Sequence, residues 1–233
     1  MKIVHRTLAV FPLLFLLTLT TQAETDLRLP PKTMNVPLAV TGDSQLGTND
    51  RRPDGHIIGL KAGAKVADFN LKAHNGEPIN LEVLLEEAPL LVIFYRGGWC
   101  PYCNVQIRQL TEAYPEFKKR GVFPVLISVD EIDGAALASR TYDIPFAVLS
   151  DPKLSAHTAF DVVMDVDAET YKQYQGYGID LEKWSGQNHH KIAVSSAFIV
   201  DNTGTVKWAH TTMDYKTRPS PEQLLKVIDD LKL

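Results

Sequence analysis

Cys100 and Cys103 are the only cysteines of this 233-residue chain, and two residues separate them. A disulfide between them would close a very short loop and add only about 2 kcal/mol of stability in the chain-entropy account. The spacing therefore indicates a redox-active pair. An inert buried disulfide and half of a zinc site are the alternatives, but a structural zinc site needs four ligands, and the sequence offers no second C-x-x-C or spaced histidine pair. We expect no metal, and no flavin or haem motif indicates another cofactor.

The residues around the pair predict where each thiol lies. Leu90 to Tyr95 is a continuous apolar run of the kind that forms a central parallel strand. After Gly97-Gly98 the apolar residues recur at helical spacing, and Pro101 suits the first helical position. Cys100 should lie at the helix N-terminus, where free N–H groups and the macrodipole favour a thiolate. We therefore expect Cys100 to be the exposed attacking thiolate and Cys103, at the start of the apolar stripe, to be the shielded resolving thiol.

Residues 1–23 have the pattern of a signal peptide. Lys2 and Arg6 precede an apolar stretch from Leu8 to Leu19, and small residues ending at Ala23 suit cleavage there. The stretch is shorter than the about 20 residues of a membrane span, although an uncleaved anchor is the alternative. We expect an exported protein, periplasmic or secreted, with no stable membrane association after cleavage. Oxidising compartments permit disulfides, so a pair kept reduced there needs a dedicated electron donor.

Charge and composition bound the partners and the domain organisation. The formal net charge is −4, and the basic residues are not clustered, which argues against nucleic acid as a partner. A hydrophobic content of 45% suits one compact domain. Residues 24–59 differ because prolines and glycines are scattered there without a period, which predicts an irregular N-terminal arm before a domain at 60–233.

Within 60–233, strand and helix patterns alternate. Asn75-Gly76 predicts a hairpin turn, and Pro115 is expected to kink or shorten the long helix that follows the cysteines. A strand, a helix and a strand in one sheet imply a parallel crossover. The remaining elements are predicted as helices at 81–87, 135–141, 151–160 and 221–231, and strands at 122–129, 146–149, 196–200 and 206–209.

Several segments carry a family resemblance: Gly63 to Phe69, Phe94 to Cys103, Ile144 to Pro152, Phe198 to Asp201 with the Gly204 turn, and Asp214 to Arg218. Together they resemble the peroxiredoxin-like branch of the alkyl hydroperoxide reductase/thiol-specific antioxidant family, over about residues 60 to 231. The resemblance implies an α/β fold, a thioredoxin-like three-layer α/β/α sandwich with a mixed central sheet and peroxiredoxin-like elaborations.

The resemblance assigns the cysteines in two ways. Peroxiredoxins carry P-x-x-x-T-x-x-C with the last cysteine attacking, which puts Arg96 at the proline, Cys100 at the threonine and Cys103 at the attacking position. In the thioredoxin and glutaredoxin register Cys100 attacks, and Cys-Pro-Tyr-Cys is the glutaredoxin motif. Trp99 is expected to shield the thiol.

Besides the cysteine motif, the segment near Ser195 also departs from the family pattern. That segment has neither the cis-proline of thioredoxin-like reductases nor the arginine that many peroxiredoxins place near the peroxide, although the Ser195 hydroxyl is a candidate hydrogen-bond donor. Arg96 is our substitute cation, to lower a thiol pKa or hold a peroxide oxygen, with an arginine turned to solvent as the alternative. Arg140 and Arg218 are weaker candidates.

The function implied is that of an antioxidant thiol peroxidase. A thiolate would reduce hydrogen peroxide or an organic hydroperoxide, a Cys100–Cys103 disulfide would form, and an external thioredoxin-like dithiol would reduce it. A thiol–disulfide oxidoreductase acting on exported proteins is the alternative enzyme. A redox-inactive scaffold is a third reading, which the presence of both cysteines disfavours. Peroxiredoxin-like proteins often dimerise, so a homodimer is one option for the assembly.

Overall fold

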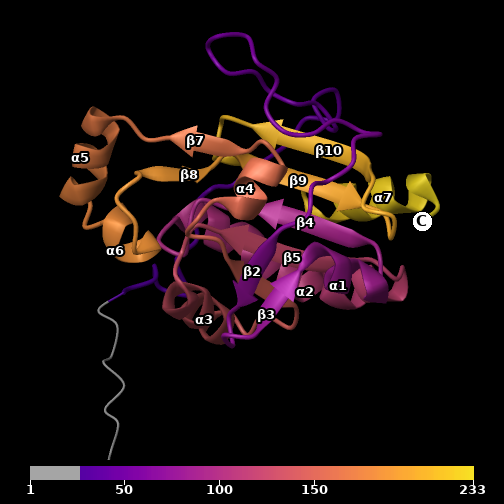
Figure 1. Cartoon of the computed structure of the whole chain (residues 1–233), viewed down its shortest axis with the longest axis horizontal. Coiled ribbons are helices and arrows are strands. Elements are labelled where there is room, and N and C mark those ends of the chain that lie inside the picture. The colour runs from indigo at the N-terminus through magenta and orange to yellow at the C-terminus, as the bar shows by residue number, and fades with distance from the viewer. Residues whose placement is uncertain (1–26) are drawn as a thin grey trace, which may run out of the picture.

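A mixed seven-stranded sheet forms the centre of the molecule in the computed structural model, which describes residues 27–233 (Figure 1). The strand order is β10-β9-β4-β5-β6-β2-β3. Strands β4, β5 and β6 run parallel, whereas β9 and β2 pair antiparallel with β4 and β6. The strands are β2 (Asn70–Ala73), β3 (Pro78–Asn80), β4 (Leu90–Phe94), β5 (Phe123–Ser128), β6 (Ala147–Ser150), β9 (Ser195–Val200) and β10 (Val206–Thr212). The predicted mixed sheet and parallel crossover are confirmed.

Helices cover both faces of this sheet because alternate residues of β4 point to opposite sides. Leu91 and Ile93 belong to a core cluster with α2 (Pro101–Lys119), α3 (Ile132–Thr141) and α7 (Pro221–Leu231). Leu90 and Val92 belong to a second cluster with α1 (Leu81–Glu87) and α4 (Ser155–Ala159). The predicted three-layer arrangement is therefore present.

Three predicted helix boundaries are wrong, and one of them is the start of α3, at Ile132 and not at 135. Helix α2 continues past Pro115 to Lys119. A proline removes one hydrogen-bond donor, but Phe117 beyond it is fully buried, and its packing holds the last turn in place. Helix α4 begins at Ser155, four residues later than predicted, because the Asp151 carboxylate accepts the backbone N–H groups of Ser155 and His157 and so forms a turn ahead of the helix.

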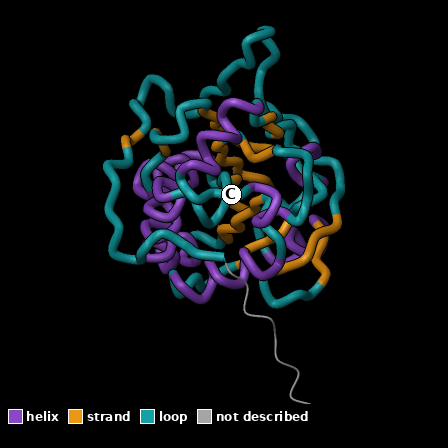
Figure 2. The backbone as a smooth tube through the Cα atoms, turned by 90° about the vertical axis from the view of Figure 1, so that its left-hand side faces the viewer, coloured by secondary structure: helices purple, strands orange, loops and turns teal. Residues whose placement is uncertain are grey.

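Two segments lie outside the central sheet. Loops connect the helices and strands around the sheet (Figure 2). The arm before Leu60 is mostly loop, and it contributes β1 (Ala39–Val40), which pairs with β11 (Thr217–Arg218). Although the arm is irregular, its Ile58 is fully buried. The second segment, between α4 and β9, contains β7 (Val163–Asp165), α5 (Ala168–Gly176), α6 (Leu181–Ser185) and β8 (Lys191–Ala193).

The predicted signal segment, residues 1–23, lies outside the described residues. Within residues 27–233, none of the helices combines the length and the apolar character that a membrane crossing requires.

Candidate active site

The two cysteines lie together at the start of α2, directly after the loop that follows β4. Cys100 is the N-cap residue, and the Cys103 backbone N–H donates to its Sγ at 3.4 Å. The two Sγ atoms are 2.8 Å apart, and both cysteines are free thiols. Cys100 lines a pocket but is only 1% exposed, so the predicted exposed position is wrong because the loop and the pocket residues cover it, and Cys103 is completely buried. The pair is therefore a reduced dithiol whose sulfurs are already in contact.

Arg218 contacts one sulfur of the pair, and the pKa values of the two thiols shift in opposite directions. Its Nη2 lies 3.6 Å from Cys103 Sγ, and its Nε donates to Gln106 at 3.2 Å. Burial by itself raises a thiol pKa, but the hydrogen bond with Cys100 and the Arg218 charge outweigh it and lower the pKa of Cys103 to about 5. Burial and the adjacent Cys103 sulfur raise the pKa of Cys100 well above its ordinary value. These opposite shifts favour the thiolate on Cys103 and the protonated thiol on Cys100.

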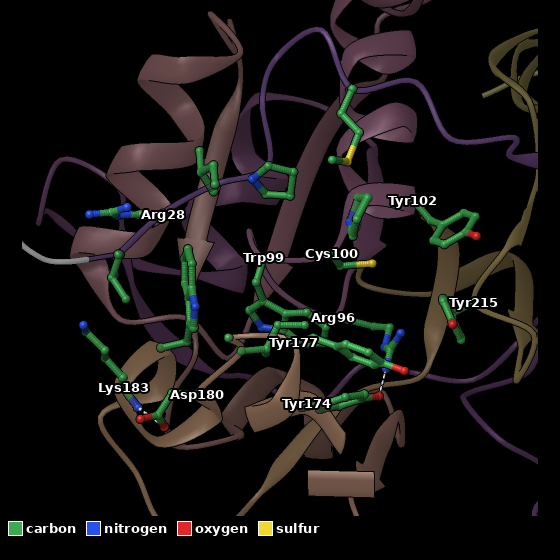
Figure 3. Close-up of a pocket in the computed structure, with 18 residues that line it drawn as sticks. Arg28, Arg96, Trp99, Cys100, Tyr102, Tyr174, Tyr177, Asp180, Lys183 and Tyr215 are labelled. Carbon is green, nitrogen blue, oxygen red and sulfur yellow. Dashed lines mark hydrogen bonds between the residues drawn. The ribbon is translucent and has the colours of Figure 1, made fainter. Parts of the chain in front are cut away.

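Arg96 is buried in the same pocket, with its guanidinium among aromatic rings. The guanidinium carbon lies 4.1 Å from the ring centre of Tyr215, 5.1 Å from that of Trp99 and 5.4 Å from that of Tyr174. Figure 3 shows the hydrogen bond from Arg96 to the Tyr174 hydroxyl. The Arg96 charge favours the thiolate forms of both cysteines and its backbone N–H donates to Cys103, but among the described residues Arg218 is the arginine whose side chain has a hydrogen bond to a sulfur.

A buried acid lies beneath the loop that carries the cysteines. Asp130 follows β5, and its carboxylate accepts the Gly98 backbone N–H at 2.7 Å. Its second oxygen has no partner among the described residues, and burial raises its pKa to about 7. Gly97 has φ of +149°, and a Cβ there would lie 2.3 Å from Trp99 Nε1 and 2.8 Å from Asp130 Oδ1. Glycine at this position therefore lets the loop approach both side chains.

The other predicted positions are placed as follows. Ser195 is buried, and its hydroxyl has no hydrogen-bond partner in the described part of the chain. Trp99 is also buried and lines the pocket beside Cys100, as its predicted shielding role requires. No group of three or more potential metal ligands occurs within residues 27–233.

Sequence reasoning missed Asp130 and ranked Arg218 below Arg96. Arg218 is 115 positions from Cys103 and belongs to β11, which pairs with β1. Directly after β1, the Thr41 backbone N–H donates to the Arg218 carbonyl at 2.8 Å. The one available signal was the resemblance of Asp214 to Arg218 to the family, which marked the segment without assigning a role to the arginine.

Comparison with known proteins decides the family. The model described as "AhpC/TSA family" matches residues 62–209, more than half of the chain. The chain belongs to the AhpC/TSA family. Among curated proteins it is similar to chloroplastic peroxiredoxin Q of Sedum lineare, with 33% identity over 89 residues, 38% of this chain and 47% of that protein. The corresponding Arabidopsis thaliana protein is 32% identical over 92 residues, 40% of this chain and 42% of that protein. The matched region thus spans about half the length of these relatives.

Solved structures of proteins named peroxidoxin or peroxiredoxin share the fold. Peroxidoxin BcpB from Mycobacterium tuberculosis superposes with a TM-score of 0.59 and 20% identity over 74% of this chain and 97% of that chain. Xanthomonas campestris peroxiredoxin Q gives a TM-score of 0.55 with 18% identity, over 71% of this chain and 92% of that chain. The predicted thioredoxin-like fold with peroxiredoxin character is confirmed.

Proposed function

We propose that this protein is a thiol peroxidase that reduces a hydroperoxide through Cys103 and Cys100. The observation that carries the proposal is the geometry of the dithiol: Cys103 Sγ lies 3.6 Å from Arg218 Nη2 and 2.8 Å from the Cys100 sulfur. The thiolate is the nucleophile toward a peroxide, and the lowered pKa of Cys103, about 5, favours that form at neutral pH. Family membership and similarity to proteins named peroxiredoxin support the same reaction.

The reaction balances with the two sulfurs alone. The Cys103 thiolate attacks the terminal oxygen of a hydroperoxide, the O–O bond breaks, and Cys103 becomes a sulfenic acid while the alkoxide or hydroxide takes a proton. The Cys100 sulfur then attacks the sulfenic sulfur, and a disulfide and water form. An external dithiol returns two electrons and two protons, which restores the starting pair.

This assignment reverses the order that the sequence favoured. The N-cap position argues for a Cys100 thiolate, but that sulfur receives one backbone N–H, whereas Cys103 receives a full guanidinium charge. The peroxiredoxin register also puts the attacking thiol at Cys103. Because Cys100 lines the pocket and Cys103 is buried behind it, the Cys100 side chain must move aside for peroxide to enter.

Two assays run together test the function. In the first, reduced protein is mixed with hydrogen peroxide or an organic hydroperoxide in a stopped-flow instrument, and we expect consumption far faster than by free cysteine. In the second, insulin reduction is followed with the same preparation, and we expect little activity because Cys103, the proposed nucleophile, is completely buried, whereas an external donor needs to reach only Cys100 in the pocket. Peroxide consumption at the rate of free cysteine would contradict the proposal, and rapid insulin reduction would favour a thiol–disulfide oxidoreductase.

Export and the reductant belong to the same proposal. The pattern of residues 1–23 supports an exported protein, in the periplasm or secreted, and an exported peroxidase needs a thioredoxin-like dithiol donor in that compartment. Cell fractionation with mass measurement of the mature N-terminus tests the location: a mature chain starting near Glu24 outside the cytoplasm is expected, and an intact N-terminus in the cytoplasm would contradict it.

A further inference from the structure

The pocket that ends at Cys100 is much larger than hydrogen peroxide. Its volume is about 810 Å³, within the range of small-molecule sites, whereas one water takes up about 30 Å³. Aromatic rings line much of it, together with the charged Arg28, Arg96, Asp180 and Lys183 (Figure 3). The rings belong to Trp99, Tyr102, Tyr174, Tyr177, Trp184 and Tyr215. Such a surface suits an apolar group attached to the peroxide.

Part of the pocket is lined by the segment Leu27–Met34, which precedes the residues that match the family and contributes Leu27, Arg28, Leu29, Pro30 and Met34. Leu27 and Leu29 pack against the core cluster that contains both cysteines. A Cβ on Gly98 would lie 2.7 Å from Leu29 Cδ2 and 3.2 Å from Trp184, so Leu29 contacts the loop next to Cys100. The beginning of the described chain therefore lies beside the loop that carries the dithiol. Figure 1 shows this indigo segment near α3 and α6.

Polar contacts hold this segment in place. The Tyr142 hydroxyl donates to the Pro30 carbonyl at 3.3 Å, Lys32 pairs with Asp143 at 2.5 Å, and Arg108 of α2 donates to the Met34 carbonyl at 2.9 Å. The three anchors lie on α2 and at the C-terminal end of α3. Leu27–Met34 is thus an ordered wall of the pocket.

We propose that Leu27–Met34 is a specificity element that holds the organic group of a bulky apolar hydroperoxide. The proposal rests on the proposed function, because the peroxide reacts with the dithiol as described above and leaves as the corresponding alcohol. Leu29 contributes apolar contact only to a substrate that has an organic group, since hydrogen peroxide is too small and polar to gain from it. This segment should therefore affect the two kinds of peroxide differently.

The test compares Leu29→Ala with Val83→Ala in the full-length protein. Val83 is on α1, 47% exposed and outside the pocket, so it controls for shortening an apolar side chain away from the dithiol. We expect Leu29→Ala to lower kcat/KM for cumene hydroperoxide roughly tenfold or more and to leave the value for hydrogen peroxide unchanged. Val83→Ala should change neither. Equal losses for both peroxides, or no loss for either, would overturn the proposal.

Binding of the product alcohol separates this proposal from the peroxidase function. Cumyl alcohol does not react with thiols, and Trp99 and Trp184 line the pocket, so intrinsic fluorescence can report its binding. Leu29→Ala should weaken that binding by a similar factor, and unchanged binding would count against the pocket wall. A wild-type protein that binds the alcohol but consumes neither peroxide would refute the proposed function, not the pocket.

Discussion

Replacing Arg218 by Gln should raise the pKa of Cys103 and move the onset of its reactivity to higher pH. Arg218 Nη2 is 3.6 Å from the Cys103 sulfur, and a hydrogen bond to a charged group contributes about 1.5–3 kcal/mol. One pKa unit corresponds to about 1.4 kcal/mol, so the pKa should rise by about one to two units from the present value of about 5. Because the folded-state pKa stays near or below 7, the thiolate fraction at neutral pH falls at most by about half. A single rate at neutral pH therefore tests little, and the full pH profile is needed.

The measurement is the rate of iodoacetamide alkylation against pH in a Cys100→Ser background, where Cys103 is the remaining thiol and the serine hydroxyl can still donate to it. Arg120→Gln, at the opposite end of α2, changes the net charge equally and serves as the control. Arg218→Lys keeps the charge and should give an intermediate midpoint. If the midpoint is the same with Arg218→Gln as in the parent, Arg218 does not stabilise the thiolate and our account of the charge distribution is refuted.

Two further predictions concern the loop beneath the pair. Burial raises the pKa of Asp130 to about 7, so its ionisation lowers the stability of the fold as the pH rises from about 4, the unfolded-state pKa, to about 7. In urea unfolding, Asp130→Asn should therefore be more stable than the parent by up to a few kcal/mol above about pH 7 and equally stable below about pH 4. A stability difference that does not depend on pH would contradict this. Gly97→Ala should destabilise the protein by more than about 2 kcal/mol and slow the reaction with peroxide, because the added Cβ would overlap Trp99 and Asp130. A variant with the stability and the peroxide rate of the wild type would contradict this and show that the loop can move.

The elements that carry the dithiol could be predicted because their signals are local. Leu90 to Phe94 is apolar throughout and lies in the centre of the sheet, and Pro101 begins α2 directly after Cys100. The last helix begins after Ser220, whose capping box is evident from a serine followed three residues later by Gln223. In each case the decisive residues are neighbours in the sequence.

The surroundings of the sulfurs could not be predicted in this way, because they depend on contacts between distant residues. Arg96 is four positions from Cys100, which made it the obvious cation, yet aromatic rings from separate segments hold its guanidinium. Arg218 reaches Cys103 from 115 positions away, and Leu29 reaches the same loop from the irregular arm. A single sequence does not show which distant residues are in contact in the fold. The arm also lacks a repeating hydrophobic pattern that would predict its position in the structure.

The central claim is that Cys103 is the attacking thiolate of a peroxidase. Its most direct test is to treat reduced Cys100→Ser and Cys103→Ser variants with peroxide in the presence of dimedone and to locate the adduct by mass spectrometry. Our account predicts a sulfenic acid adduct on Cys103 in Cys100→Ser and no adduct in Cys103→Ser. An adduct on Cys100 in Cys103→Ser, with none in Cys100→Ser, would contradict it.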